Sequence, residues 1–188
     1  METALTPLEF ARRTRKYYGD REGVVDGDLR LTYEEFFARC DRWSSALQAM
    51  GVAKGDRVAY IAPNTHEQLE SFYAVPQIGA VLVPINFRLT ADDFVYIANH
   101  SGASVLCVHP DYVAAVDGIR DQLKTVEQFV VLGKAENRSG WRDYEAELAQ
   151  AKPSFKRPEI AESDLLTINY TSGTTAKPKG VMMTHRNA

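Results

Sequence analysis

The sequence predicts an α/β fold with a doubly wound, largely parallel sheet flanked by helices. The first observation is alternation, because apolar segments of strand length alternate with segments of helix length over most of the chain. The second is that these strand segments are apolar at nearly every position, as expected when helices cover both faces of a parallel sheet. The third is size, since 188 residues with 45% hydrophobic content can bury one sizeable core.

The chain opens with an amphipathic segment, Pro7 to Tyr18, and the turn Asp26-Gly27-Asp28 then predicts a β-hairpin. Thr32 and Glu35 have the spacing of a capping box, which predicts a helix that runs to Met50 and ends at Gly51. The remaining expected elements are a strand Arg57 to Ala62, a helix Thr65 to Ile78, a strand Ala80 to Pro84, a helix Ala91 to His100 capped by Thr90, a strand Ser104 to Val108, a helix Tyr112 to Leu123, a strand Gln128 to Leu132, a short helix Trp141 to Ala149 and a strand Leu165 to Tyr170.

Prolines mark two irregular places. Pro76 removes a backbone donor inside the expected helix Thr65 to Ile78, so we expect a kink there. The stretch Ala151 to Ser163 contains two prolines and mixed charge, which predicts a linker before the last part of the chain.

Composition excludes some classes of protein. The net charge of -3 argues against a nucleic-acid-binding protein, which needs a basic face. Basic residues do gather at Arg12, Arg13, Arg15 and Lys16; a solvated helix face is the expected explanation, with an anionic membrane or nucleic acid as the alternative.

Cys40 and Cys107 lie far apart without metal-ligand spacing, which predicts buried thiols in a reducing compartment. No signal peptide and no apolar stretch of about 18 residues is visible, so we expect a cytoplasmic protein without a transmembrane segment.

The histidines and the large aromatic residues are expected to have structural roles and not catalytic ones. The four histidines, which have neither i, i+4 partners nor an adjacent nucleophile, are expected to lie at the surface or cap helices; they are His66, His100, His109 and His185. The aromatic residues of the predicted helices are expected in the core rather than in an acyl channel; they are Phe72, Tyr73, Phe94 and Tyr96. Trp43 and Trp141 are also assigned to packing.

The segment Tyr170 to Gly180 predicts a loop that holds phosphate. Its sequence, Tyr-Thr-Ser-Gly-Thr-Thr-Ala-Lys-Pro-Lys-Gly, offers four hydroxyls, two ammonium groups and no carboxylate directly after an apolar strand. A polyphosphate is the expected ligand. A solvated, hydroxyl-rich turn remains the alternative from composition alone.

Two common phosphate motifs do not fit this loop. In a Walker A loop Pro178 would stand where the second glycine belongs, and Lys179 is followed by Gly180 instead of a hydroxyl residue. No G-x-G-x-x-G follows a strand. The apolar Val181 to Met183 predicts a second strand, so the loop is expected to join two strands without a helix dipole.

Tyr170 to Gly180 resembles the signature loop of the adenylate-forming superfamily, which includes acyl-CoA synthetases, luciferases and adenylation domains of peptide synthetases. Leu31 to Phe36 and Gly79 to Asn86 resemble two earlier segments of that family, in family order. Val83 to Leu89 and Asn99 to Ala103 resemble fatty and related acyl-CoA synthetases more than peptide-synthetase domains, so the chain is most like a fatty acyl-CoA synthetase. Ala176 departs from the pattern, because the family usually has glycine there, and we expect a small effect.

The resemblance implies a two-step reaction at one site. Family members join a carboxylic acid to the α-phosphate of ATP, release pyrophosphate, and the acyl-CoA synthetases then transfer the acyl group to coenzyme A. Loop donors would stabilise charge that builds on the departing pyrophosphate. By this resemblance the ATP-binding residues are Thr171, Ser172, Gly173, Thr174, Thr175 and Lys179, whereas Lys177, beside a proline, either contacts phosphate or faces water. Mg²⁺ would arrive with ATP, and Thr174 is the residue assigned to assist it.

The resemblance also implies that much of the machinery lies elsewhere. The acidic magnesium ligand, the ribose-binding aspartate, the adenine pocket and the catalytic lysine lie downstream in relatives. We therefore expect residues 1–188 to be an incomplete N-terminal AMP-binding domain that is inactive alone, with 164–188 contributing a strand, the phosphate loop and a second strand.

Two further expectations depend on this interpretation. Asn187 is expected to cap a helix, and self-association through exposed sheet edges is a further expectation. The alternative function is a stand-alone, non-catalytic module for nucleotide binding or assembly.

Overall fold

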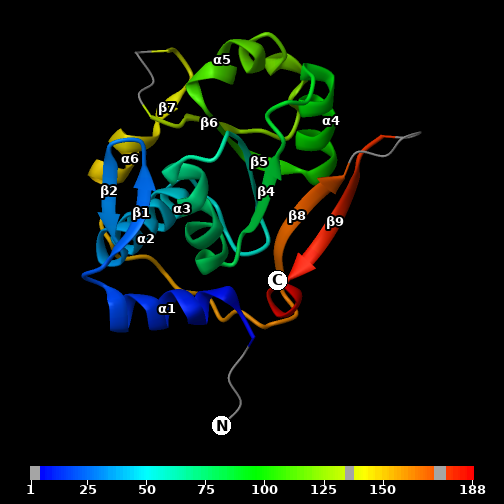
Figure 1. Cartoon of the computed structure of the whole chain (residues 1–188). Coiled ribbons are helices and arrows are strands. Elements are labelled where there is room, and N and C mark those ends of the chain that lie inside the picture. The colour runs from blue at the N-terminus through cyan, green and yellow to red at the C-terminus, as the bar shows by residue number, and fades with distance from the viewer. Residues whose placement is uncertain (1–4, 134–137, 172–176) are drawn as a thin grey trace.

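A seven-stranded sheet runs through the middle of the molecule, with helices on both of its faces (Figure 1). The computed structural model describes residues 5–133, 138–171 and 177–188. The strands within these ranges are β1 (Glu22–Asp26), β2 (Leu29–Thr32), β3 (Arg57–Ile61), β4 (Val81–Ile85), β5 (Ala103–Val108), β6 (Gln128–Val131), β7 (Arg142–Asp143), β8 (Leu165–Thr171) and β9 (Lys179–Thr184). The helices are α1 (Pro7–Tyr18), α2 (Tyr33–Ala49), α3 (His66–Ala74), α4 (Ala91–Ser101), α5 (Pro110–Asp117) and α6 (Tyr144–Gln150).

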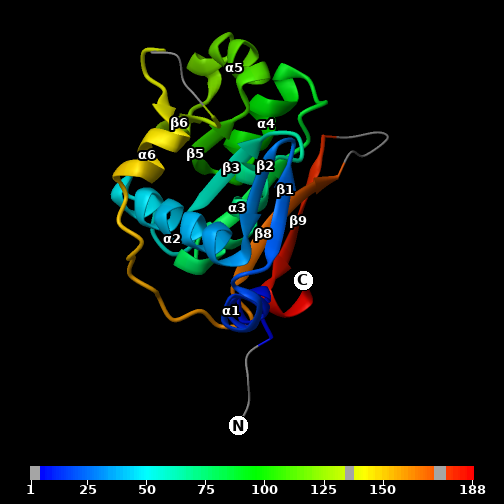
Figure 2. The same ribbon diagram turned by 60° about the vertical axis from the view of Figure 1, so that its left-hand side comes forward.

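The strand order of the sheet is β7-β6-β5-β3-β4-β8-β9. Every neighbouring pair is parallel except β8 and β9, which are antiparallel. The strands β1 and β2 form a separate antiparallel hairpin that lies over the helices in Figure 2. The predicted fold class, a doubly wound and largely parallel sheet flanked by helices, is confirmed.

Side chains of the central strands alternate between two cores because successive residues of a strand point to opposite faces. In β3, Val58 and Tyr60 join the core beneath α2, α3 and α6. Ala59 and Ile61 join the core beneath α4 and α5. All four are fully buried, so β3 is covered on both faces, as its continuous apolar sequence predicts.

Short-range signals set several helix boundaries. The backbone N–H of Glu35 donates to Thr32 Oγ1 and that of Thr32 donates to Glu35 Oε2, which completes the predicted capping box of α2. Gly51, just beyond this helix, has a φ of 95°, a conformation that strains other residues. Thr90 caps α4 through an equivalent box with Asp93.

Three expected helices differ in the structure. The helix expected over Thr65 to Ile78 is an α-helix only as far as Ala74 and gives way to a 3₁₀ turn at Pro76, because proline lacks the N–H that would continue it. The helix expected over Tyr112 to Leu123 begins earlier, at Pro110, and ends at Asp117, where Gly118 follows. The helix expected over Trp141 to Ala149 begins later, at Tyr144 after its N-cap Asp143. The residues before it form β7, which pairs with β6.

Some single-residue expectations hold and others are wrong. Trp43, Trp141 and Phe94 are buried, and so are the two free cysteines. Phe72 is 41% exposed and therefore not a core residue. Among the histidines, His109 caps α5 as expected, whereas His185 is buried with its Nδ1 2.7 Å from Thr6 Oγ1. Asn187 Oδ1 accepts hydrogen bonds from the backbone N–H and the hydroxyl of Thr184 in the final 3₁₀ turn, and its expected role as the cap of a following helix stays a prediction.

In the described ranges, no helix combines the length and the apolar composition that a bilayer crossing requires.

Candidate functional site

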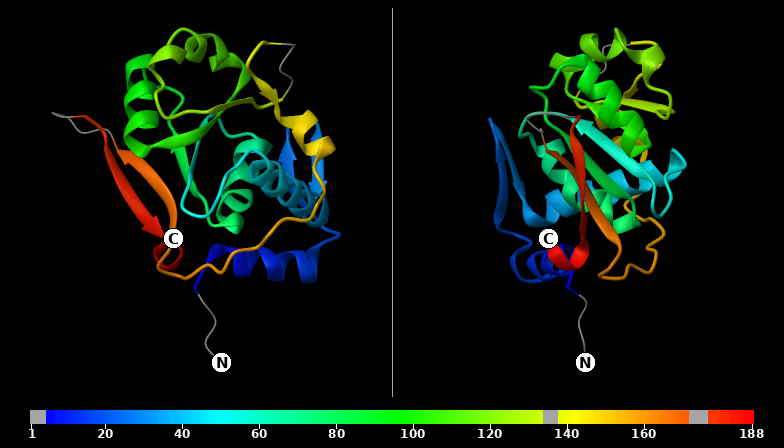
Figure 3. Two further views of the ribbon diagram at one scale, coloured as in Figure 1. Left: turned by 180° about the vertical axis from the view of Figure 1, so that it is seen from behind. Right: turned by 90° about the vertical axis from the view of Figure 1, so that its right-hand side faces the viewer.

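The predicted phosphate loop connects β8 and β9, which form a long hairpin at one edge of the sheet (Figure 3). Thr171 and Lys179 face each other across the two strands at the base of this loop. The connection between two strands is as predicted. Four of the predicted ligands, Ser172, Gly173, Thr174 and Thr175, lie outside the described residues, as do Ala176 and the magnesium role assigned to Thr174.

The base of the loop, at the end of β8, lies at the edge of the sheet where the parallel strands end. β8 pairs in parallel with β4, and β4 with β3, so Thr171, Ile85 and Ile61 all lie at the carboxyl ends of their strands. Ligands of doubly wound folds bind outside this edge. The geometry therefore places the base of the loop where a substrate of this fold class is expected.

Helix α4 packs beside the base of the loop. The Nζ of Lys177 lies 5.1 Å from the centre of the Tyr96 ring, close enough for a cation–π contact. The Tyr170 hydroxyl lies 2.7 Å from His100 Nδ1, and the Tyr96 and His100 rings stack at 5.1 Å. These contacts tie the end of β8 and the far side of the loop to the same helix face.

A hollow of about 530 Å³ opens between α4 and the base of the loop; its lining residues are Asp92, Val95, Tyr96, Asn99, His100, Gln122 and Lys177. Lys179 is exposed and, among the described residues, neither Lys179 nor Lys177 forms an ion pair with a carboxylate. An ammonium group that lines the hollow, Lys177, and a second one at the base of the loop, Lys179, are suited to an anionic ligand.

Tyr96 packs against the core, and His100, expected at the surface or at a helix cap, is exposed, but the sequence interpretation missed the contacts that the two rings make with each other and with Tyr170. Their signal is a pair of ring side chains at i and i+4 on one helix face. That spacing shows that the two rings meet, but the partner Tyr170 comes from 70 residues away and only the fold reveals it.

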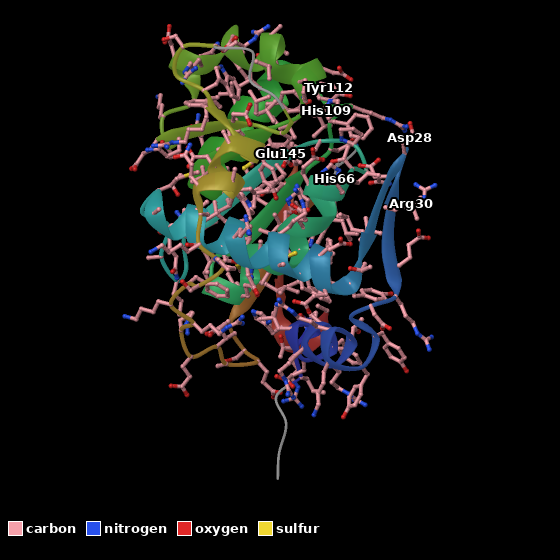
Figure 4. The ribbon with its side chains drawn as sticks, turned by 90° about the vertical axis from the view of Figure 1, so that its left-hand side faces the viewer. Asp28, Arg30, His66, His109, Tyr112 and Glu145 are labelled. Carbon is pink, nitrogen blue, oxygen red and sulfur yellow. The ribbon has the colours of Figure 1, made fainter. Side chains whose placement is uncertain are left out.

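A second polar cluster lies on the opposite face of the sheet. His66 Nδ1 is 2.8 Å from Asp26 Oδ2 and 3.3 Å from Glu67 Oε2, and His66 Nε2 is 3.9 Å from Glu145 Oε1. Figure 4 shows His66 and Glu145 on α3 and α6. Asp26, His66 and Glu67 are close enough together to hold a metal ion. They are already satisfied as an ion-pair network, because the imidazolium lies between the carboxylates.

This network predicts a pH dependence of stability. Burial alone would lower the pKa of His66, but attraction to Glu145 and Asp26 outweighs it and raises the pKa to about 9 from 6.5. His66, with Arg39, lowers the pKa of Glu145 to about 2, so that carboxylate stays ionised over this range. A raised pKa stabilises the fold fully below pH 6.5, and the stabilisation is lost as the pH rises through 9.

We therefore expect the free energy of unfolding to fall by about 2 kcal/mol more between neutral pH and pH 9 in the wild type than in His66→Gln. Urea unfolding at a series of pH values measures this difference. Parallel curves for the two proteins would contradict the ionic role of His66.

The sequence matches the AMP-binding enzyme family over residues 10–188. This range covers nearly the whole chain. The chain belongs to the AMP-binding enzyme family.

Similar curated members of this family are CoA ligases. The chain is 36% identical to 4-hydroxybutyrate--CoA ligase 2 of Metallosphaera sedula over 195 residues, which cover 99% of this chain and 35% of that protein. It is 37% identical to a long-chain-fatty-acid--CoA ligase of Thermus thermophilus over 190 residues, covering 99% of this chain and 34% of the relative. The chain thus spans about a third of the length of these relatives.

Solved structures of the family agree with the fold. The N-terminal domain of FACL13 from Mycobacterium tuberculosis superimposes with a TM-score of 0.85 at 33% identity, covering 96% of this chain and 44% of that one. The anthranilate CoA ligase AuaEII superimposes with a TM-score of 0.93 at 24% identity, covering 99% of this chain and 36% of that one. The predicted resemblance, the N-terminal portion of an adenylate-forming enzyme, is confirmed.

Proposed function

We propose that this chain is the ATP-binding N-terminal portion of an AMP-forming acid–CoA ligase that activates a carboxylic acid, with a fatty acid as the preferred substrate class. The observation that carries the proposal is the β8–β9 hairpin, whose two strands flank the segment rich in hydroxyl and lysine residues at the carboxyl edge of a largely parallel sheet in an AMP-binding enzyme. Both relatives described above are named as CoA ligases, and one of them is named for long-chain fatty acids.

The proposed role of the loop is to bind the β and γ phosphates of ATP. Thr171 and Lys179 flank it in register, and Lys179 has no carboxylate partner among the described residues. The ammonium group and the loop donors would stabilise negative charge on pyrophosphate as it leaves. Mg²⁺ would enter with ATP and neutralise part of this charge, and hydroxyl oxygens are suitable ligands for it. Coenzyme A would be the second substrate.

The same proposal holds that residues 1–188 lack groups needed for catalysis. The described residues around the loop provide cations, a phenol and an imidazole, but the only carboxylate that lines the adjacent hollow is Asp92. A complete site would need further acidic groups for magnesium and ribose. A reducing, cytoplasmic location is part of the proposal and is supported by the two buried free thiols.

We expect the 188-residue chain alone to show no acid-dependent exchange of pyrophosphate into ATP. The longer protein that contains it should catalyse this exchange with a carboxylic acid and should form acyl-CoA when CoA is added. The assay follows labelled pyrophosphate with a panel of short, long and aromatic acids. Turnover by the chain alone would contradict its incompleteness. No exchange by the longer protein with any acid would favour the non-catalytic alternative.

Self-association remains part of the proposal. β9 is the last strand of the sheet order, and Val181 and Met182 on it are 47% and 64% exposed. Unpaired edge strands with apolar side chains pair readily with other chains. Light scattering that found only a monomer over a wide concentration range would contradict it.

A further inference from the structure

Helix α1 presents an aromatic and basic face to the solvent. None of its 12 residues is buried. Phe10 is 70% exposed and Tyr17 is 62% exposed. Arg13 lies between them on the same side of the helix, because the spacing 10, 13, 17 is i, i+3, i+7. A short helix with two large exposed rings on one face has apolar surface that the rest of the described chain does not cover.

The charge of this helix is strongly positive. It contains four basic residues and one acidic residue, Glu9, which gives a net charge of +3 in a chain whose net charge is -3. Arg12 pairs with Glu9 at 2.6 Å. Arg13 and Lys16 have no carboxylate partner within the part of the chain that the structure describes. Their charges are therefore free to meet a negatively charged surface.

The helix is fixed to the body of the protein at both ends. At its beginning, the capping residue Thr6 is 2.7 Å from His185 through the hydroxyl and Nδ1. Near its end, Arg15 pairs with Glu34 at 2.7 Å and with Asp41 at 2.6 Å. These contacts turn Arg15 inward and leave the outer face in one orientation. A face that is already ordered loses little conformational entropy on binding.

The helix lies at the end of the molecule away from the phosphate loop. His185 follows β9 directly, and β9 runs back from the loop for six residues, so His185 is about 20 Å from the loop base. Figures 1 and 2 both show α1 at this opposite end. Docking through α1 would therefore leave the candidate nucleotide site open.

We propose that the outer face of α1, made of Phe10, Arg13, Lys16 and Tyr17, docks on a membrane surface that contains anionic phospholipids, together with the exposed Leu5 that precedes the helix and lies on the same surface. Charge complementarity carries the choice of partner, since helix-borne lysine and arginine are attracted to anionic headgroups. The exposed rings distinguish a lipid surface from a soluble polyanion, because aromatic side chains gain by entering the apolar boundary beneath the headgroups. This inference does not depend on the proposed ligase activity.

The test is co-sedimentation of the 188-residue chain with vesicles of phosphatidylcholine alone or mixed with phosphatidylserine. The wild type should bind the mixed vesicles, bind the neutral ones weakly, and detach as salt is raised. Arg13→Glu/Lys16→Glu should lower the partition coefficient by about tenfold or more because four units of charge change near the surface. Phe10→Ser/Tyr17→Ser should also lower it and make the remaining binding more sensitive to salt.

Matched control variants lie elsewhere on the surface. Phe72→Ser removes an exposed ring from α3, and Lys124→Glu/Lys152→Glu reverses two exposed charges outside α1. Both should bind mixed vesicles as the wild type does. Failure of the wild type to bind mixed vesicles would overturn the proposal, and retention on DNA or polyglutamate in that case would assign the face to another polyanion. Equal losses in the control and α1 variants would also overturn it.

Discussion

Replacing Arg39 by methionine is expected to lower the free energy of unfolding by about 3–5 kcal/mol, which is the usual result of removing one partner of a buried ion pair. Arg39 Nε pairs with the carboxylate of Glu70, whose side chain is fully buried. Tyr144 donates a second hydrogen bond to that carboxylate. Without Arg39, Glu70 would keep the phenol but lose the charge that balances it. Burial already raises the pKa of Glu70, and the loss would raise it further.

Chemical denaturation at neutral pH measures this loss. Arg138→Met is the matched control, since Arg138 pairs with Asp117 at 3.0 Å on the exposed surface and should contribute less than about 1 kcal/mol. Adding Glu70→Gln to the Arg39 variant removes the buried charge and should recover part of the stability. An Arg39 variant as stable as the Arg138 variant would show that the buried pair is not needed.

Under the proposed function, Lys179→Ala in the full-length ligase should lower kcat for pyrophosphate exchange about a hundredfold, or about 2.7 kcal/mol in the activation barrier. The reason is that Lys179, opposite Thr171 at the loop base, would stabilise charge that develops only as pyrophosphate departs. Lys177→Ala is the comparison variant. Its ammonium group lies over the Tyr96 ring, so we expect less than about a fivefold change.

Initial rates at saturating ATP separate kcat from KM for these two variants. A larger loss for Lys177→Ala than for Lys179→Ala would reverse the assigned roles. Lys177 and Lys179 are both exposed and form no ion pair among the described residues, so each alanine variant should unfold at the same denaturant concentration as the wild type, which would show that the lost rate is local.

The fold was predictable wherever its signals are local in sequence. The capping boxes at Thr32 and Thr90 join residues three apart, and the continuous apolar strands specify burial on both faces. The interruption of α3 was foreseen at Pro76, but local sequence did not show that the helix would end at Ala74. β7 was missed because two residues joining β6 at the sheet edge leave no periodic pattern.

The candidate site was only partly predictable for the same reason. The loop could be recognised because its hydroxyl and lysine residues are contiguous. The contact between His100 and Tyr170 and the ion pairs of Glu145 with Arg39 join distant residues, and no spacing in the sequence indicates them. His185 shows the opposite error, since an isolated histidine was expected at the surface or at a helix cap and is buried with its ring against the Thr6 hydroxyl.

The most direct test of the central claim is an amide NMR titration of the 188-residue chain with magnesium pyrophosphate. The proposed loop predicts saturable shifts at Thr171, Lys179 and the residues between them, with shifts of neighbouring Tyr96 and His100. The basic residues of α1 should move little. Absence of saturable shifts at the loop, or saturable shifts confined to Arg12, Arg13 and Lys16, would contradict phosphate binding by this loop.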